Sequence, residues 1–544
     1  MEQKVDVVIV GAGAAGGIVG KELAEAGMAV VQLDKGRWFT QSDAVHDELS
    51  SDKNVPRTIT KLEGLEENPR SFRRDENSPT RVAPIGWNAF GVGGGTMWYG
   101  AASWRFHEEH FRMRSTYGRP EGTTLDDWPL TYDDLEPHYE KAEYELGVSG
   151  LAGADPFGPP RKKPYPVPPL PTNPQGELFA KAARKLGLHP FPPPFAIITE
   201  DYQGRTGCIR CPFCIGYVCE VDAKSSTALT VIPIAQSTGN YTLKTKCVVD
   251  RVVTDDRGRV IGVSYFDENE QHNFQPAHIV IISANAGESA RILLNSRSRQ
   301  WPNGLANSSD QVGRNLMTHI GANSFGIFDF DIPHEWGPGP SMAVNDFAEG
   351  ALGGGHIYNF YVHHPIRFTR SRPPGAPRWG KAHKDFQRKY FQRFMHMNSD
   401  VADMPAEFNR VEIDPHLRDG WGIPALRITR RFLPIDVEHS KFVSARQREI
   451  LEAAGAIEIW SAPAGGGGYL GQHQCGTCRM GKDPKASVLN RYCQTHDIDN
   501  LFVIDTSCFV SFPGHNPTLT AQAIAYWSSD YIRREWKSGA LRRA

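Results

Sequence analysis

The first 35 residues combine apolar and glycine-rich stretches in the order typical of a β–α–β unit. The apolar run 5–10 predicts a buried strand. Apolar positions from Ile18 to Ala24 predict a helix that ends at Gly27, and the run 28–33 predicts a second, parallel strand. The turn after the first strand therefore lies where the N-terminus of a helix can bind phosphate.

Later segments extend this pattern. Residues 241–266 alternate as a hairpin with its turn at 255–258, and 277–284 is a nearly all-apolar run of the kind buried in a parallel sheet. Polar and aromatic segments alternate over 330–460, which is compatible with a separate antiparallel sheet. The proline-dense stretch 164–171 predicts a stiff connecting loop.

Composition narrows the class of protein. The 544 residues are 40% hydrophobic and 22% charged with a formal net charge of −2, so neither nucleic acid nor an anionic membrane is expected as the main partner. Residues 367–393 carry nine basic side chains and one acidic one, which we interpret as a solvated face rather than a docking patch. No apolar run approaches the roughly 18–20 residues that span a bilayer. The first strand leaves no room for a signal peptide, so we expect a cytoplasmic protein.

The glycine turn reads Gly11-x-Gly13-x-x-Gly16, and Asp34 follows the second strand. The first glycine permits the tight turn, the second allows close approach of a pyrophosphate, and the third allows the helix to pack on the strand. A carboxylate at Asp34 can bind the hydroxyls of an adenosine ribose. The motif predicts a dinucleotide site but does not distinguish NAD from FAD.

Further motifs distinguish FAD from NAD as the expected cofactor. Segments 91–96, 104–106, 283–289, 307–316 and 501–505 match, in order, motifs of one family. With them the chain resembles the glucose–methanol–choline (GMC) family of FAD oxidoreductases, and the resemblance runs nearly end to end. It is similar within that family to bacterial pyranose oxidases, glycoside 3-oxidases and FAD sugar dehydrogenases.

The resemblance implies an α/β and α+β architecture, with a Rossmann-like FAD-binding domain and an antiparallel-sheet substrate-binding domain interleaved in sequence. We expect 1–110, 205–325 and 465–544 to form the FAD-binding domain. Residues 111–204, which include the proline-rich connection, and 326–464 are then expected to form the substrate-binding domain.

His473 and Asn516 match the family's catalytic pair. An imidazole can accept a hydroxyl proton near neutral pH, and an amide can hydrogen-bond the same oxygen without carrying charge. His515 adjoins Asn516 and is a second candidate for this place. The cofactor-binding residues implied are Gly11, Gly13, Ala14, Ala15, Gly16, Asp34, Lys35, Gly93, Gly94, Thr96, Val248, Ala284, Asp505, Asn516 and Thr518. The candidate substrate residues are Asn398, Asp400, Glu407 and His515.

Two features bear on the cofactors. Some relatives tether FAD through a histidine in the segment that corresponds to 92–106, but here Trp98 stands at the matching place and no histidine lies in that range, so we expect non-covalent FAD. Cys208, Cys211, Cys214 and Cys219 could ligate an iron–sulfur cluster or zinc. Their spacing departs from ferredoxin patterns, and structural thiols or a disulfide are favoured over a metal.

The leading hypothesis is an FAD-dependent oxidase or dehydrogenase that oxidises the C2 or C3 hydroxyl of a sugar or glycoside, with O2 or a quinone as electron acceptor. An alternative is the catalytic subunit of an iron–sulfur-containing, electron-transferring sugar dehydrogenase. A third hypothesis, a flavin-binding protein without turnover, is disfavoured by the intact His473 and Asn516. Regiochemistry and oligomeric state stay open.

Overall fold

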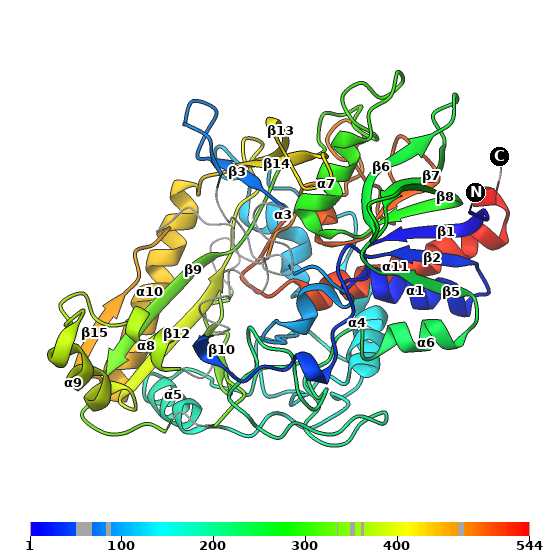
Figure 1. Cartoon of the computed structure of the whole chain (residues 1–544). Helices are drawn as coiled ribbons and strands as arrows, with labels where there is room; N and C mark the ends of the chain where they lie inside the picture. The colour runs from blue at the N-terminus through cyan, green and yellow to red at the C-terminus, as the bar shows by residue number, and fades with distance from the viewer. Residues whose placement is uncertain are drawn as a thin grey trace.

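The structure of the protein is a computed structural model that describes residues 2–49, 68–82, 89–333, 336–348, 354–360, 364–465 and 473–542. Its named strands form three sheets. The seven-stranded sheet lies on the right of Figure 1 beside both ends of the chain, and the five-stranded sheet lies on the left. None of the described helices is long and apolar enough to cross a membrane.

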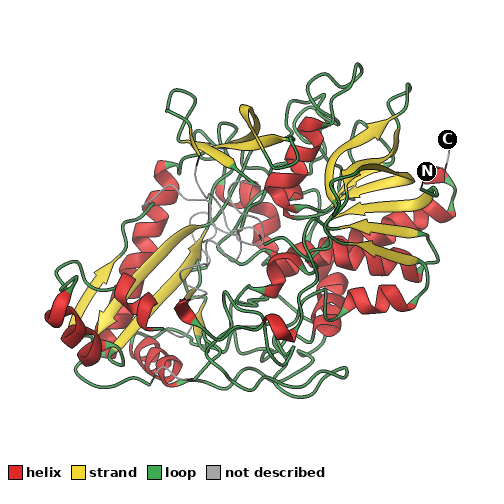
Figure 2. Cartoon of the chain, in the orientation of Figure 1, coloured by secondary structure: helices red, strands yellow, loops and turns green. Residues whose placement is uncertain are grey.

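The seven-stranded sheet has a parallel core. Its order is β5 (Tyr241–Lys244), β2 (Val30–Leu33), β1 (Val5–Val10), β8 (His272–Ile282), β7 (Val260–Phe266) and β6 (Val248–Thr254), with β16 (Leu501–Val503) also paired to β8. Helices α1 (Gly16–Glu25), α4 (Tyr132–Leu146), α6 (Val231–Ser237) and α11 (Thr518–Lys537) lie on one side of this sheet (Figures 1 and 2). The largest hydrophobic core fills the space between the sheet and these helices.

The predicted β–α–β unit and the hairpin are confirmed as β1–α1–β2 and β6–β7. The strand predicted at 277–284 begins earlier, at His272, and changes partners along its length. Its first half pairs antiparallel with β7 and is partly exposed, whereas its second half is buried between β1 and β16, both parallel to it. Only the buried half has the all-apolar pattern, so only that half was predicted.

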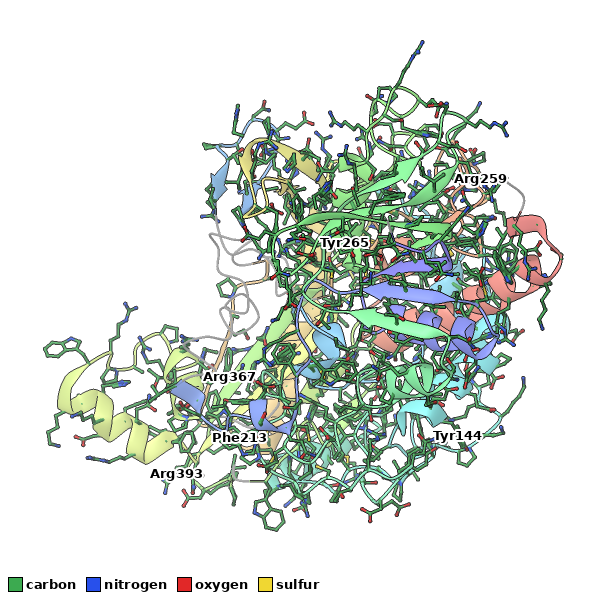
Figure 3. All side chains as sticks on the ribbon, turned by 45° about the vertical axis from the view of Figure 1, so that its right-hand side comes forward. Tyr144, Phe213, Arg259, Tyr265, Arg367 and Arg393 are labelled. Atoms are coloured by element: carbon green, nitrogen blue, oxygen red, sulfur yellow. The ribbon has the colours of Figure 1, made fainter. Side chains whose placement is uncertain are left out.

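The predicted antiparallel sheet is also confirmed. Its order is β10 (Ala343–Val344), β11 (Ile357–Asn359), β12 (Phe394–Val401), β9 (Ile320–Ile327) and β15 (Glu458–Ser461), and α5 (Pro174–Lys185) and α10 (Pro434–Ala454) pack against it. Helices α8 (Pro365–Arg370) and α9 (Gly380–Tyr390) lie at its far end in Figure 1. No residue of α9 is buried, as expected of a solvated basic face. Figure 3 labels Arg367 and Arg393 at this end, well away from Arg259 and Tyr265 of the other lobe.

The third sheet joins distant parts of the chain. Its order is β13 (Arg410–Arg418), β14 (Pro424–Thr429), β3 (Arg70–Arg73) and β4 (Arg81–Val82). Strand β3, which lies in the range expected to belong to the FAD-binding domain, runs parallel to β14 of the range expected to bind substrate. The boundaries at 110 and 464 stay predictions.

The remaining elements are short. Helices α3 and α7 span Met113–Tyr117 and Asn285–Asn295, and 3-10 helices span Gln41–Asp43, Gly94–Met97, Glu108–Arg112, Thr506–Cys508 and Ala540–Arg542. The proline-dense stretch 164–171 contains no helix or strand, as predicted.

Candidate active site

A long cavity lies at the carboxyl ends of the parallel strands, the usual ligand position of an open α/β sheet. Most of the predicted cofactor residues line it. They are Gly11, Gly13, Ala14, Ala15, Asp34, Lys35, Gly94, Val248, Ala284, Asp505 and Thr518. The structure therefore brings together residues from the two ends and the middle of the chain.

The glycine turn has no room for side chains. A Cβ atom on Gly11, which has a φ of 97°, would lie 2.3 Å from the carbonyl oxygen of Ser283. A Cβ atom on Gly16 would lie 2.2 Å from the carbonyl oxygen of Gly11. Gly16 thus does not line the cavity but allows α1 to pack beside the turn, as the motif predicts.

Gly93 and Thr96 also stand behind the cavity wall. The backbone N–H of Gly93 donates to the carbonyl of Ala12 over 2.8 Å, and Thr96 Oγ1 donates to the carbonyl of Gly93 over 2.5 Å. A Cβ on Gly93 would lie 2.3 Å from Ser226 Oγ. These two residues shape the loop that presents Gly94 to the cavity.

Asp34 follows β2 and is buried against the glycine turn. Its carboxylate accepts hydrogen bonds from the backbone N–H groups of Ala12 over 2.8 Å and Gly36 over 2.9 Å. Burial raises the pKa of Asp34, and these backbone donors oppose the rise. Each carboxylate oxygen has a second lone pair that remains for a ribose hydroxyl.

Glu288 is a cavity residue that the sequence analysis quoted in a motif but did not select. Its carboxylate pairs with Arg70 over 3.0 Å and with Arg291 over 3.1 Å. Burial opposes ionisation of Glu288, but Arg291, Arg70 and Lys35 outweigh it and lower its pKa to about 2. Glu288 is therefore charged and partly neutralises the basic residues on this wall.

The residues present fit FAD. The glycine turn leaves space for a pyrophosphate, Asp34 can bind a ribose, and Thr518 brings the N-terminus of α11 to the cavity wall. Pro517 is the N-cap of α11, which begins at Thr518.

His473 and Asn516 lie together, each close in the chain or in space to residues that line this cavity. Asn516 Nδ2 is 3.3 Å from His473 Nε2. The residue after His473 accepts a hydrogen bond from Thr506, which lines the cavity, and Asn516 lies two residues before Thr518. The predicted pair is thus held by the same two segments that close the cofactor cavity.

Asp400, predicted as a substrate residue, contacts the pair itself. Asn516 Nδ2 donates to Asp400 Oδ2 over 3.0 Å, and Asp400 Oδ1 is 3.9 Å from His473 Nδ1. Burial opposes ionisation of Asp400, but His319 and His473 outweigh it and hold its pKa below the ordinary value. A charged carboxylate at this place orients the Asn516 amide, because the amide oxygen would be repelled from it.

His319, which precedes β9, is a site residue that the sequence analysis missed. Its Nδ1 atom is 2.9 Å from His473 Nδ1, and its Nε2 atom is 2.9 Å from the carbonyl oxygen of Pro513. Its ring stacks on Phe512 at a centroid distance of 3.9 Å. No motif surrounds His319, so nothing in the sequence distinguished it from the other histidines.

The surroundings of His473 favour its neutral form. Burial lowers the pKa of His473 to about 4, and the negative charge of Asp400 opposes this shift. A neutral imidazole with a lone pair is the form that can accept a proton.

The other candidate substrate residues differ in position. Asn398 lies two residues before Asp400 on β12 and donates to the hydroxyl of Tyr358 over 2.5 Å. Glu407 is not brought to the site, because it lies in an exposed turn 3.6 Å from Arg314. His515 is fully buried and packs against Trp104 and the imidazoles behind the pair, so the structure gives the place beside His473 to Asn516.

The cysteine turn lies next to Trp98, whose carbonyl accepts a hydrogen bond from the N–H of Gly216 over 2.7 Å. All four thiols, Cys208, Cys211, Cys214 and Cys219, are unpaired with one another, and burial raises the pKa of Cys208 to about 11. Among the residues that the structure describes, no three of these sulfurs converge within 4.8 Å of one another. Cys211 instead groups with His46 and Glu220.

Comparison with known proteins identifies the family. A family model for the N-terminal part of GMC oxidoreductases matches residues 5–321, and one for the C-terminal part matches 405–525. The chain is 29% identical to the gluconate 2-dehydrogenase flavoprotein of Pantoea cypripedii, over 98% of this chain and 94% of that protein. It is 30% identical to the 2-methyl-1,2-propanediol dehydrogenase of Mycolicibacterium austroafricanum, over 98% and 95%.

Among solved structures, pyridoxine 4-oxidase from Mesorbium loti has the same fold. Its TM-score is 0.65 at 17% identity, and the match covers 98% of this chain and 99% of that one. The chain belongs to the GMC oxidoreductases, a family of FAD-binding flavoproteins, and is an oxidoreductase that acts on CH–OH groups.

Proposed function

We propose that this enzyme oxidises a secondary ring hydroxyl, at C2 or C3, of a sugar or glycoside to the keto-sugar with non-covalently bound FAD. The observation that carries the proposal is the pairing of His473 and Asn516 next to segments that line the cofactor cavity. Asp400 orients the Asn516 amide and His319 contacts His473 at Nδ1, whereas His473 Nε2 faces the Asn516 amide, where a hydroxyl group could meet both side chains.

In the proposed reaction, the substrate hydroxyl gives its proton to His473 Nε2 while its oxygen accepts a hydrogen bond from Asn516 Nδ2. The carbon loses its hydrogen as hydride, and the C–O single bond becomes a carbonyl. Bound FAD would supply the two-electron acceptor for this hydride. Asp400, 3.9 Å from His473 Nδ1, favours the positive charge that the ring acquires.

The substrate class is supported by the surroundings of the pair. Asn398 and Asp400 project from the same face of β12 and can bind further hydroxyl groups. Two relatives are named for gluconate and for 2-methyl-1,2-propanediol, both of which carry adjacent hydroxyl groups. We propose O2, giving H2O2, or a quinone as the acceptor that reoxidises the enzyme.

The test is anaerobic reduction of the bound flavin with a panel of monosaccharides, glycosides and simple alcohols, followed by reoxidation with air or a quinone. We expect bleaching of the flavin by at least one sugar or glycoside, and product analysis then assigns C2 or C3. Bleaching by simple alcohols alone would contradict the sugar substrate, and no bleaching by any alcohol would favour a flavin-binding protein without turnover.

Replacing Asp34 with alanine is expected to weaken FAD retention more than turnover per bound flavin, because a ribose contact would be lost far from the reacting atoms. The measurement is the FAD content after gel filtration. Asp6→Ala is the matched control, since Asp6 also accepts a backbone N–H (that of Ala29, over 2.9 Å), but at the opposite end of β1. Equal FAD content in the Asp34 variant and the wild type would show that the ribose contact is misassigned.

Acid denaturation is expected to release intact FAD, because no histidine lies in 92–106. The same preparation should show a plain flavin spectrum and negligible iron and zinc. Flavin that stays with the precipitated protein would contradict non-covalent binding. Stoichiometric iron in anaerobically prepared protein would instead favour the electron-transferring, iron–sulfur-containing dehydrogenase, with Cys208, Cys211, Cys214 and Cys219 as the ligands to examine first.

A further inference from the structure

His319 touches neither the cofactor cavity nor, in the proposed reaction, the substrate, yet both of its ring nitrogens are engaged. The side chain is 4% exposed, and its ring lies on Phe512 with an angle of 10° between the planes. Its Nδ1 atom faces His473 Nδ1 over 2.9 Å, and Nε2 faces the carbonyl oxygen of Pro513 over 2.9 Å. A ring held at both nitrogens and stacked on one face has a single orientation.

These contacts determine where the protons lie. A carbonyl oxygen can only accept a hydrogen bond, so His319 Nε2 carries a hydrogen and donates it to Pro513. In a neutral imidazole the other nitrogen is then an acceptor, so the hydrogen between the two Nδ1 atoms belongs to His473. His473 Nε2 is left with a lone pair, and this is the nitrogen that lies 3.3 Å from Asn516 Nδ2.

Asp400 strengthens this arrangement. Its Oδ1 atom lies 3.5 Å from His319 Nδ1 and 3.9 Å from His473 Nδ1, so a negative charge faces the hydrogen between the rings. The same carboxylate accepts from Asn516 Nδ2 and thereby orients the amide. The two members of the catalytic pair are thus each held by a further residue.

We propose that His319 is a positioning residue that fixes the tautomer of His473, keeping its hydrogen on Nδ1 and its lone pair on Nε2. The role rests on the proposed function, because a fixed tautomer matters only if His473 Nε2 accepts the proton of the alcohol. Hydrogen bonds of this kind to a reacting histidine decide which of its nitrogens is basic.

The experiment uses three variants of the FAD-loaded enzyme. His319→Phe keeps a ring that can stack on Phe512 but removes both nitrogens. His319→Gln keeps an acceptor for His473 and a donor for Pro513 on one amide. His396→Phe is the matched control, because His396 is also buried and stacked on a phenylalanine, Phe325 at 4.4 Å, and its Nε2 atom hydrogen-bonds Asn323.

We expect His319→Phe to slow anaerobic flavin reduction about 10–100-fold, the usual cost of losing a residue that orients a reacting group. His319→Gln should recover a large part of the rate, and His396→Phe should reduce its flavin at the native rate. If the Phe variant does not retain FAD, His319→Leu replaces it.

The pH profile separates positioning from mere structural damage. A neutral His319 that accepts the Nδ1 hydrogen of His473 favours the protonated form of His473, so its removal should lower the pKa of His473 further. Because only neutral His473 can accept a proton, the rise of the rate with pH should move to lower pH in His319→Phe and much less in His319→Gln. General damage to the fold would lower the rate of flavin reduction without shifting its pH dependence.

The proposal would be overturned if His319→Phe reduced its flavin at the native rate or faster. It would also be overturned if the Phe and Gln variants lost the same fraction of the rate and the pH dependence of reduction stayed unchanged. A stoichiometric metal ion held by His319, Asp400 and His473, whose ligand atoms lie within 4.8 Å of one another, would overturn it as well. The alcohol that reduces the wild-type flavin fastest is used throughout. Failure of every alcohol to reduce the wild type, or native reduction by His473→Ala, would instead contradict the proposed function.

Discussion

Replacing His473 with alanine is expected to slow reduction of the bound FAD by about 10²–10⁴-fold, the usual contribution of a positioned acid–base group. Its side chain is 15% exposed, and its Nε2 atom faces Asn516. FAD binding should survive, because His473 does not line the part of the cavity that holds the dinucleotide. Stopped-flow measurement of flavin bleaching under anaerobic conditions provides the rate.

The wild-type rate should rise with pH as His473 loses its proton. Because burial lowers the pKa of His473 to about 4, this limb should lie below neutral pH in the free enzyme. His515→Ala is the informative comparison, since His515 adjoins Asn516 but packs away from His473. Near-native reduction by His473→Ala together with a large loss in His515→Ala would assign the base to His515.

Replacing Asp403 with alanine is expected to lower the free energy of unfolding by about 3–5 kcal/mol, the cost of leaving one charge of a buried ion pair unpaired. Asp403 Oδ2 accepts hydrogen bonds from Arg430 and from the backbone N–H of Thr318, and the side chains of both charged residues are fully buried. Chemical denaturation followed by tryptophan fluorescence measures the change.

Glu407→Ala is the matched control for Asp403. It also removes a carboxylate that pairs with an arginine, but Glu407 is 59% exposed and 3.6 Å from Arg314, so the expected cost is about 0–1 kcal/mol. The double variant Asp403→Leu, Arg430→Leu should recover part of the loss, because neither member of this pair is then left buried without the other. Equal stability of the two single variants would show that the Asp403–Arg430 pair contributes little.

The parts of the fold that follow from local patterns could be predicted from the sequence. The apolar runs of β1 and β2 and the alternation of β6 and β7 repeat over a few neighbouring residues, and their partners are close in the chain. The pairing of β3 with β14 could not be predicted, because it joins Phe72 to Ile428 across more than half of the chain. Hydrophobic periodicity identifies a strand but carries no information about a distant partner.

The candidate site likewise contains residues that could be predicted from the sequence and residues that could not. Glycines are informative because the conformation of Gly11 excludes other residues, and His473 and Asn516 stand in recognisable motifs. Asp400 and Glu407 were selected on equal grounds, yet the first lies in a strand that faces the pair and the second in an exposed turn. His319 had no motif, and only the three-dimensional approach of β9 to the segment 512–513 reveals it.

The cofactor cavity is lined by segments that are synthesised at widely separated times, because they lie far apart in the chain. The glycine turn after β1 leaves the ribosome long before β16 and Thr518, which lie several hundred residues later in the chain. Strand β8 can therefore pair with β1 on one edge before β16 is available to pair with its other edge. Capture of FAD thus comes late, and a nascent chain that carries the complete glycine motif still lacks the wall against which the cofactor is held.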